Sequence, residues 1–383
     1  MKLAYFDNAA TTYPKPDVVY DYMDSFYRKS GANAGRGNYD IAKSASALIK
    51  ETRLLVKDLL HCPSKEVVFT PTATIALNMI IQGLIKKGVK RIYISPFEHN
   101  AVTRTLHSYE MDNSIQVHQL CVNDNFDFDI ERIKYQFDNN KPDLVIVSHV
   151  SNVLGLIAPI EGIFSLAKEY NAYTLADMSQ SAGLIDCNVG LLSFDFAVFA
   201  GHKTLYGPTG VSGFVLNPAI ELEPVIYGGT GVESAIQDMP HSLPERYEMG
   251  TLNILGIAGL NASLKWIINT GIEEIFNKEK ANRAKLISIL EKYDWIKIIG
   301  NNKGDNFVGI VSCLIDGISS DSAGSIFSQR GIAVRTGLQC APLAHKFIST
   351  FPAGTIRFSV SYFTSSDDFE ELEQTLDYIE GEF

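Results

Sequence analysis

Two residues of this sequence have types and places that suggest covalent cofactor chemistry. Lys203 follows an apolar run, residues 196–200, inside the glycine-broken turn Gly201-His202-Lys203. The charge of a lysine is easily removed by burial, and its neutral amine suits attachment of an aldehyde cofactor. Asp177 ends another apolar run, and its carboxylate could keep a pyridinium nitrogen protonated. Alone, a lysine in such a turn is more often solvated or a phosphate contact. Together the two residues predict a pyridoxal-phosphate (PLP) site.

A threonine-rich segment, residues 70–74, connects a predicted strand to a predicted helix. Ala73 and Thr74 would stand in the first helical turn, where free backbone N–H groups and the helix dipole attract an anion. A simple hydroxyl cap of the helix explains the same residues equally well. Because Lys203 needs a phosphate-anchored partner, we expect the segment to bind phosphate, with His202 donating a further hydrogen bond.

Three further polar residues lie just beyond predicted strands. His99 could stack on a flat heteroaromatic ring or move a proton, although a lone histidine is more often structural. Asn152 and Gln180 are neutral donors that suit the phenolic oxygen of the cofactor, because they stabilise negative charge without protonating it.

A cysteine and an arginine in the last fifty residues could act on a substrate. Cys340 lies in a glycine-containing loop near Arg335 and His345, and nearby cations raise the thiolate fraction. The other four cysteines have apolar neighbours, and their wide spacing indicates neither a disulfide framework nor a zinc site. Arg357 could hold a substrate carboxylate in two parallel hydrogen bonds, with a structural salt bridge as the alternative.

Short apolar runs alternate with helical stretches, which predicts a mainly parallel sheet covered by helices. The predicted strands cover residues 66–70, 91–95, 144–149, 172–176, 194–199 and 211–216, with helices over 73–84 and 160–170. In such sheets ligands bind outside the carboxyl ends of the strands, where most of these polar residues fall. After Gly250, helices over 254–270 and 272–292 and strand-like runs over 307–315 and 355–360 indicate a second, α+β domain.

The bulk composition is that of a globular enzyme with two domains. The chain has 383 residues, 46% of them hydrophobic and 20% charged, which excludes disorder. No apolar run approaches the roughly 18 residues that span a bilayer. The net charge of −11 and the scattered Lys and Arg argue against a nucleic-acid surface. The first residues fit neither a secretory signal nor a transit peptide, so we expect a cytoplasmic protein.

Four segments resemble the class V enzymes of the PLP-dependent aminotransferase fold, and most closely the cysteine desulfurases and selenocysteine lyases. They are residues 5–12, 201–210, 335–341 and 357–359, in the expected order along nearly the whole chain. The Arg-Thr-Gly-x-x-Cys-Ala loop around Cys340 is similar to that of the group II desulfurases. The resemblance implies an α/β protein of fold type I. Its large PLP-binding domain, residues 15–255, would have a mainly parallel seven-stranded sheet, and residues 1–14 and 256–383 would form a smaller α+β domain.

The resemblance also implies a role for each candidate residue. Lys203 would bind PLP covalently, Asp177 would hold its pyridine nitrogen and His99 would stack on its ring. Cys340 would take the sulfur of L-cysteine as a persulfide, releasing L-alanine, and pass it to a sulfur-acceptor protein. The implied substrate contacts are Asn8, Ala9, Asn152 and Arg357. The other implied cofactor contacts are Ala73, Thr74, Asn152, Gln180, His202 and, from the second subunit of a homodimer, Thr251.

Three positions depart from the family pattern. Ala200 stands where a serine often binds phosphate, Tyr39 where many relatives have histidine, and Leu338-Gln339 where a histidine pair is common. These departures leave open which residues contact the phosphate, how the substrate loop is arranged and how strongly Cys340 is activated.

Other activities share the same core residues. A selenocysteine lyase, a cystine or cysteine-sulfoxide lyase and an aminotransferase would all use Lys203 and Asp177, and sequence motifs separate them poorly. A non-catalytic sulfur relay would be marked by loss of the lysine or the cysteine, and both are present. A nucleotide-binding α/β protein lacks support, because the sequence has no GxGxxG or GxxxxGK[ST] run.

Overall fold

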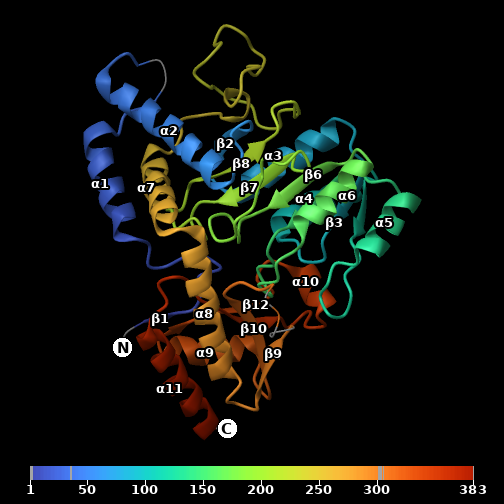
Figure 1. The fold of residues 1–383 in the computed structure, drawn as a ribbon, viewed down its shortest axis with the longest axis vertical. Helices are drawn as coiled ribbons and strands as arrows, with labels where there is room; N and C mark the ends of the chain where they lie inside the picture. Colours follow the sequence, from blue (N-terminus) through green and yellow to red (C-terminus); the bar gives the residue numbers. More distant parts are fainter. Residues whose placement is uncertain (1–2, 35–36, 301–303, 305, 383) are drawn as a thin grey trace.

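A seven-stranded sheet lies at the centre of the larger part of the molecule (Figure 1). The structure is a computed structural model that describes residues 3–34, 37–300, 304 and 306–382. The strand order is β2 (Glu66–Thr70), β8 (Ser212–Leu216), β7 (Phe196–Ala200), β6 (Tyr173–Asp177), β5 (Leu144–Ser148), β3 (Arg91–Ile94) and β4 (Gln116–Gln119). Strand β8 runs antiparallel to both of its neighbours, β2 and β7, and the other neighbouring pairs of this sheet are parallel. The predicted α/β fold with a mainly parallel sheet is confirmed.

Helices cover both faces of this sheet because its strands alternate apolar side chains between two cores. Val67 and Phe69 of β2 belong to one core, whereas Val68 belongs to the other. One face packs against α3 (Ala73–Lys86) and α4 (Asn100–Glu110). The other packs against α2 (Asp40–Leu59), α5 (Ile130–Asn139), α6 (Ile160–Glu169) and α7 (Ile254–Thr270), and α1 (Asp17–Ser30) lies on α7. A short 3-10 helix, Glu245–Tyr247, precedes α7.

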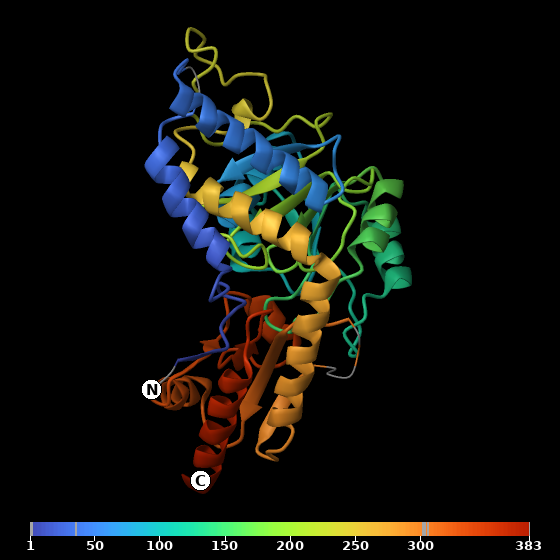
Figure 2. The ribbon, with the colours of Figure 1, turned by 60° about the vertical axis from the view of Figure 1, so that its left-hand side comes forward.

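A second, antiparallel sheet lies below the first in both views (Figures 1 and 2). Its order is β12 (Arg335–Gly337), β13 (Thr355–Ser359), β10 (Ile310–Ile315) and β9 (Ile296–Ile299). The accompanying helices are α8 (Ile272–Leu290), α9 (Ser320–Gln329), α10 (Pro342–Phe347) and α11 (Ser366–Glu382). The N-terminal strand β1 (Ala4–Tyr5) pairs with β11 (Ile332–Ala333), so the first residues lie with this smaller part.

Helix α7 lies with the large sheet, although the sequence placed nearly all of it in the smaller domain. Ile257, Leu260 and Leu264 are buried in the same core as the large sheet, and α7 packs along α1 and α2 (Figure 2). The chain turns at Gly271, whose φ of +91° favours glycine, and α8 then runs toward the smaller sheet. Within the part of the chain that the structure describes, no helix is long and apolar enough to cross a membrane.

Candidate active site

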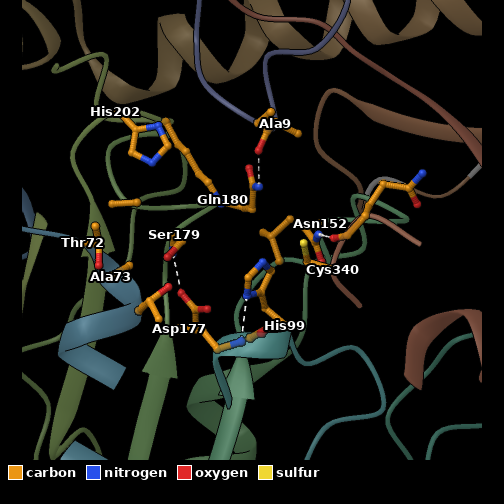
Figure 3. A pocket seen from close by; sticks show the side chains of 18 of the residues that line it. Ala9, Thr72, Ala73, His99, Asn152, Asp177, Ser179, Gln180, His202 and Cys340 are labelled. Atoms are coloured by element: carbon orange, nitrogen blue, oxygen red, sulfur yellow. Dashed lines mark hydrogen bonds between the residues drawn. The ribbon is translucent and has the colours of Figure 1, made fainter. Parts of the chain in front are cut away.

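A cavity of about 390 Å³ collects nearly all the predicted site residues (Figure 3). It lies beyond the carboxyl ends of β5, β6 and β7, as expected for an open α/β sheet. The predicted residues that line it are Ala9, Ala73, Thr74, His99, Asn152, Asp177, Gln180, His202, Lys203, Cys340 and Arg357. Residues from the N-terminal segment and from the smaller sheet therefore complete a site built on the large sheet.

Lys203 and Asp177 both line this cavity because they lie at the carboxyl ends of adjacent strands. Asp177 is the last residue of β6, is buried, and its Oδ1 accepts a hydrogen bond from the backbone N–H of Ser179 at 3.0 Å. Lys203 follows β7, and its Nζ has no hydrogen-bond partner among the described residues. Burial lowers the pKa of Lys203, while the charge of Asp177 opposes that shift. A lysine with a lowered pKa supplies the neutral amine that nucleophilic attachment needs.

His99 has a fixed tautomer because it caps helix α4. Its Nδ1 accepts the backbone N–H of Ala101 at 3.0 Å, so the ring proton of the neutral form lies on Nε2. Burial, with the charge of Lys203 as a smaller cause, lowers the pKa of His99 and favours this neutral ring. In Figure 3 the ring lies beside Asn152 and Cys340, at the edge of the cavity.

The opposite end of the cavity is a set of unused hydrogen-bond donors. The backbone N–H groups of Ala73 and Thr74, in the first turn of α3, have no partner among the described residues. Thr72 caps this helix by accepting the N–H of Ile75. The Nδ1 of His202 is buried and also lacks a partner in the described chain, and burial lowers its pKa to about 4. These groups form a site for an anion at a helix N-terminus.

Arg357 is held in place and still has unused hydrogen-bonding capacity. Its Nη1 donates to the carbonyl of Asn152 at 2.9 Å, and its Nη2 donates to Oδ1 of Asp7 at 3.0 Å. The predicted alternative of a structural salt bridge is therefore present, shared with Arg335, which also pairs with Asp7. The Nε of Arg357 is nevertheless buried without a partner in the described part of the chain, at the wall of the cavity.

Cys340 lies in a tight loop between β12 and α10. Gly337, Gln339 and Cys340 all have positive φ, of +84°, +40° and +59°. The carbonyl of Cys340 accepts the N–H of Asn100 at 2.7 Å, which ties the loop to α4. Of the five cysteines, Cys340 alone is exposed.

The other cysteines are poor nucleophiles by comparison. Burial raises the pKa of Cys62 to about 11 and the pKa values of Cys187 and Cys313 to about 12. These three stay protonated at neutral pH, and Cys121 is partly buried.

Residues 4–372 of the sequence match the sequence profile of the Aminotransferase class-V family. The chain belongs to this family. A "Probable cysteine desulfurase" of Methanothermobacter thermautotrophicus is 31% identical over 98% of this chain and 94% of the relative. A "Cysteine desulfurase" of Haloferax volcanii is 28% identical over 98% of this chain and 89% of the relative. The apo structure of a cysteine desulfurase from Thermococcus onnurineus NA1 superposes with a TM-score of 0.90 at 28% identity, covering 100% of this chain and 95% of that one.

Two predicted residues of this class V chain lie away from the cavity. The side chain of Asn8 donates to the carbonyls of Tyr5 and Ser359 and accepts the N–H of Tyr13, so it braces the N-terminal loop. Its predicted substrate contact stays a prediction. Thr251 lines a different cavity together with Thr70 and Pro71, which directly precede α3. Its predicted contact from a second subunit stays a prediction.

Several cavity residues were not among the predicted contacts. Gln339 was noted only as a departure from the family, yet its buried amide donates to the carbonyl of Thr355 and accepts from Nε2 of His345 at 2.8 Å. Ser179 gave no sequence signal, and Arg335 was noted only as a cation near Cys340. Ala200 is buried at the cavity wall without a hydroxyl group.

Proposed function

We propose that this class V protein is a PLP-dependent cysteine desulfurase, which converts L-cysteine to L-alanine and retains the sulfur as a persulfide on Cys340. The observation that carries the proposal is one cavity shared by an amine of lowered pKa, Lys203, and an exposed thiol, Cys340. Relatives at about 30% identity that are named cysteine desulfurases support the same activity.

The residues present fit PLP. The unpaired Nδ1 of His202 and the free N–H groups of Ala73 and Thr74 would hold its phosphate. Asp177 would pair with the pyridine nitrogen and Lys203 would carry the cofactor covalently. The cofactor, when bound, supplies an electron sink for the carbon that bears the substrate amine. Ala200 cannot contribute a hydroxyl, so the phosphate would depend more on the α3 terminus.

The chain's own residues would then position the substrate and move its protons. Arg357 would bind the carboxylate of L-cysteine through its unused Nε–H, while Asn152 and Asp7 each hold one of its two Nη groups in place. The neutral amine of Lys203 would remove the proton from Cα. The Nε2–H of His99 would face the cofactor ring. The amide of Gln180 donates to the carbonyl of Ala9 at 2.7 Å and would hold the N-terminal loop over the cofactor.

Cys340 would act on the substrate sulfur. As its thiolate attacks, the new S–S bond forms while the C–S bond of the substrate breaks, and the carbon skeleton takes up a proton and leaves as alanine. Holding both sulfur atoms in one cavity makes this attack effectively intramolecular.

The assembly and domain division are part of the proposal. We propose a homodimer in which Thr251 of the second subunit approaches the phosphate, supported by the exposed apolar side chains of Val18, Tyr20 and Tyr27 along α1. We also propose a large domain and a smaller one with the N-terminal segment, divided near Gly271 because α7 packs with the large sheet. A cytoplasmic location and a sulfur-acceptor protein complete the proposal.

A single-turnover assay tests the activity. The cofactor-loaded protein is mixed with a limiting amount of L-cysteine, and alanine and sulfur bound to the Cys340 peptide are measured together. In the wild-type protein we expect equal amounts of alanine and bound sulfur. Cys340→Ser should keep normal cofactor absorbance but carry no bound sulfur, and the control Cys121→Ser should behave like the wild type. Release of pyruvate and ammonia, a requirement for a keto acid, or full turnover in Cys340→Ser would reject the proposal in favour of a lyase or an aminotransferase.

A further inference from the structure

Cys340 lines two different cavities. Besides the active-site cavity, a second one of about 630 Å³ is lined by α4, by residues of β3 and β4 and by residues 338–340, 342 and 343. The two share only Gln339 and Cys340 among their lining residues. The start of α4 separates them, because His99 and Ala101 line the first and Asn100 and Thr103 line the second. A molecule in the second cavity would therefore lie against Cys340 without occupying the cofactor site.

The wall of the second cavity carries an unpaired positive charge. Asn100, Thr103, Arg104 and His107 recur at helical spacing and place their side chains on one face of α4. Arg104 is exposed and makes no ion pair or side-chain hydrogen bond within the described chain. The acid that lines this cavity, Glu110, lies at the other end of α4, roughly 9 Å along the helix axis from Arg104. A local cationic wall is notable in a protein with a net charge of −11.

We propose that the second cavity binds a small thiol that carries a carboxylate, and that this thiol removes the sulfur from Cys340. The inference rests on the proposed persulfide. Arg104 would pair with the carboxylate while the thiolate attacks the outer sulfur of the persulfide. The new S–S bond forms as the bond from that sulfur to Sγ of Cys340 breaks, so Cys340 leaves as a thiolate and the acceptor leaves as a persulfide. No oxidant or reductant is consumed.

The size and place of the cavity favour a small acceptor. Its volume lies in the range typical of small-molecule sites. Because acceptor and L-cysteine would enter by different openings, they would not compete for Arg357. The small thiol would regenerate Cys340 whether or not an acceptor protein docks.

Three thiols that differ in charge test the proposal on persulfide-loaded protein. After loading with L-cysteine and removal of the excess, the loss of sulfur from the Cys340 peptide is followed by mass spectrometry with mercaptopropionate, mercaptoethanol or cysteamine. For each thiol the rate in Arg104→Gln is divided by the wild-type rate, which cancels the intrinsic reactivity of the thiol. We expect about a three- to five-fold loss for mercaptopropionate, the size of one exposed ion pair, and little change for the neutral thiol.

Arg104→Glu should slow sulfur removal by mercaptopropionate further and should speed sulfur removal by cysteamine. The matched control Arg132→Gln removes an exposed arginine of α5 that lines neither cavity, and should change none of the ratios. Equal ratios for all three thiols in the Arg104 variants would overturn the proposal.

A second reaction separates failure of this inference from failure of the desulfurase proposal. Cys340 is capped as its methyl disulfide, which needs neither cofactor nor L-cysteine, and exchange with the same thiols is measured, with Cys340→Ser as the blank. The same dependence on Arg104 and on thiol charge is expected. If no persulfide forms but this pattern holds, only the desulfurase proposal fails. If the capped protein shows no charge dependence, the carboxylate site is wrong.

Discussion

Glu98 should make the stability of this protein depend strongly on pH. Its side chain is fully buried behind the active site, and burial raises its pKa to about 7, with the charge of Asp177 as a smaller cause. Oε1 accepts hydrogen bonds from the hydroxyl of Ser95 at 2.5 Å and from the N–H of Ser148 at 2.6 Å, and the hydroxyl of Ser148 lies 2.8 Å from Oε2. The protonated carboxyl can keep these contacts by donating from Oε2 to that hydroxyl.

The sign of the effect follows from proton binding. An unfolded glutamate ionises near its ordinary pKa, so between that value and pH 7 the folded state binds more protons at Glu98 than the unfolded state does. The stabilisation that the protonated group gives is complete at low pH and is lost as the pH rises through about 7. Between about pH 5 and pH 8 the loss from this group is about 2 to 3 kcal/mol.

Glu98→Gln should remove this loss. The glutamine can accept from Ser95 and the Ser148 N–H through its oxygen and donate to the Ser148 hydroxyl through its amide. We expect the variant's free energy of unfolding in urea, relative to wild type, to rise by about 2 to 3 kcal/mol from pH 5 to pH 8. The control Glu370→Gln changes an exposed glutamate of α11 and should shift the curve equally at all pH values. A constant difference between Glu98→Gln and wild type across this range would refute the assignment.

Three further substitutions test the site directly. Gln339→Leu removes the hydrogen bonds of this side chain to the buried Nε2–H of His345 and to the carbonyl of Thr355. The free energy of unfolding should therefore fall by about 2 to 4 kcal/mol, and alkylation of Cys340 should become faster. An unchanged alkylation rate would show that the Gln339 amide does not hold the loop that carries Cys340. Arg357→Lys loses the fixed guanidinium and should raise the KM for L-cysteine about ten-fold with normal cofactor absorbance, and an unchanged KM would argue against carboxylate binding there. His202→Leu removes the proposed phosphate donor and should weaken PLP binding about ten-fold in equilibrium titration, whereas unchanged binding would place the phosphate elsewhere.

The sequence predicted the central sheet well because its strands are continuous apolar runs. Strand β2 was predicted at its observed bounds, and the other five predicted strands differ by one or two residues at one or both ends. Strand β4 was not predicted, since Gln116–Gln119 has a polar sheet-edge composition with no apolar run. The amphipathic helices α1 and α2 were also missing from the prediction, and their covering role depends on tertiary packing against α7.

The site was predictable where a residue ends a buried strand and not where it depends on distant contacts. Asp177 and Lys203 follow β6 and β7, so parallel pairing alone brings them together. The network around Gln339 joins residues of β12, α10 and β13, and no local pattern announces such a contact. The same holds for Arg357, whose pairing with Asp7 spans nearly the whole chain. The division after residue 255 followed the family resemblance and the change in the pattern of elements after Gly250, and neither showed on which sheet α7 would pack.

Borohydride reduction of the PLP-reconstituted protein, followed by peptide mass spectrometry, tests the covalent link on which the proposed chemistry depends. We expect the cofactor on the peptide that contains Lys203 and no trapped cofactor in Lys203→Ala. Lys15 is the informative competitor, because burial lowers its pKa to about 8 and its Nζ donates to the carbonyl of His202. Trapped cofactor on Lys15, or an unmodified Lys203 in saturated protein, would contradict the proposed site.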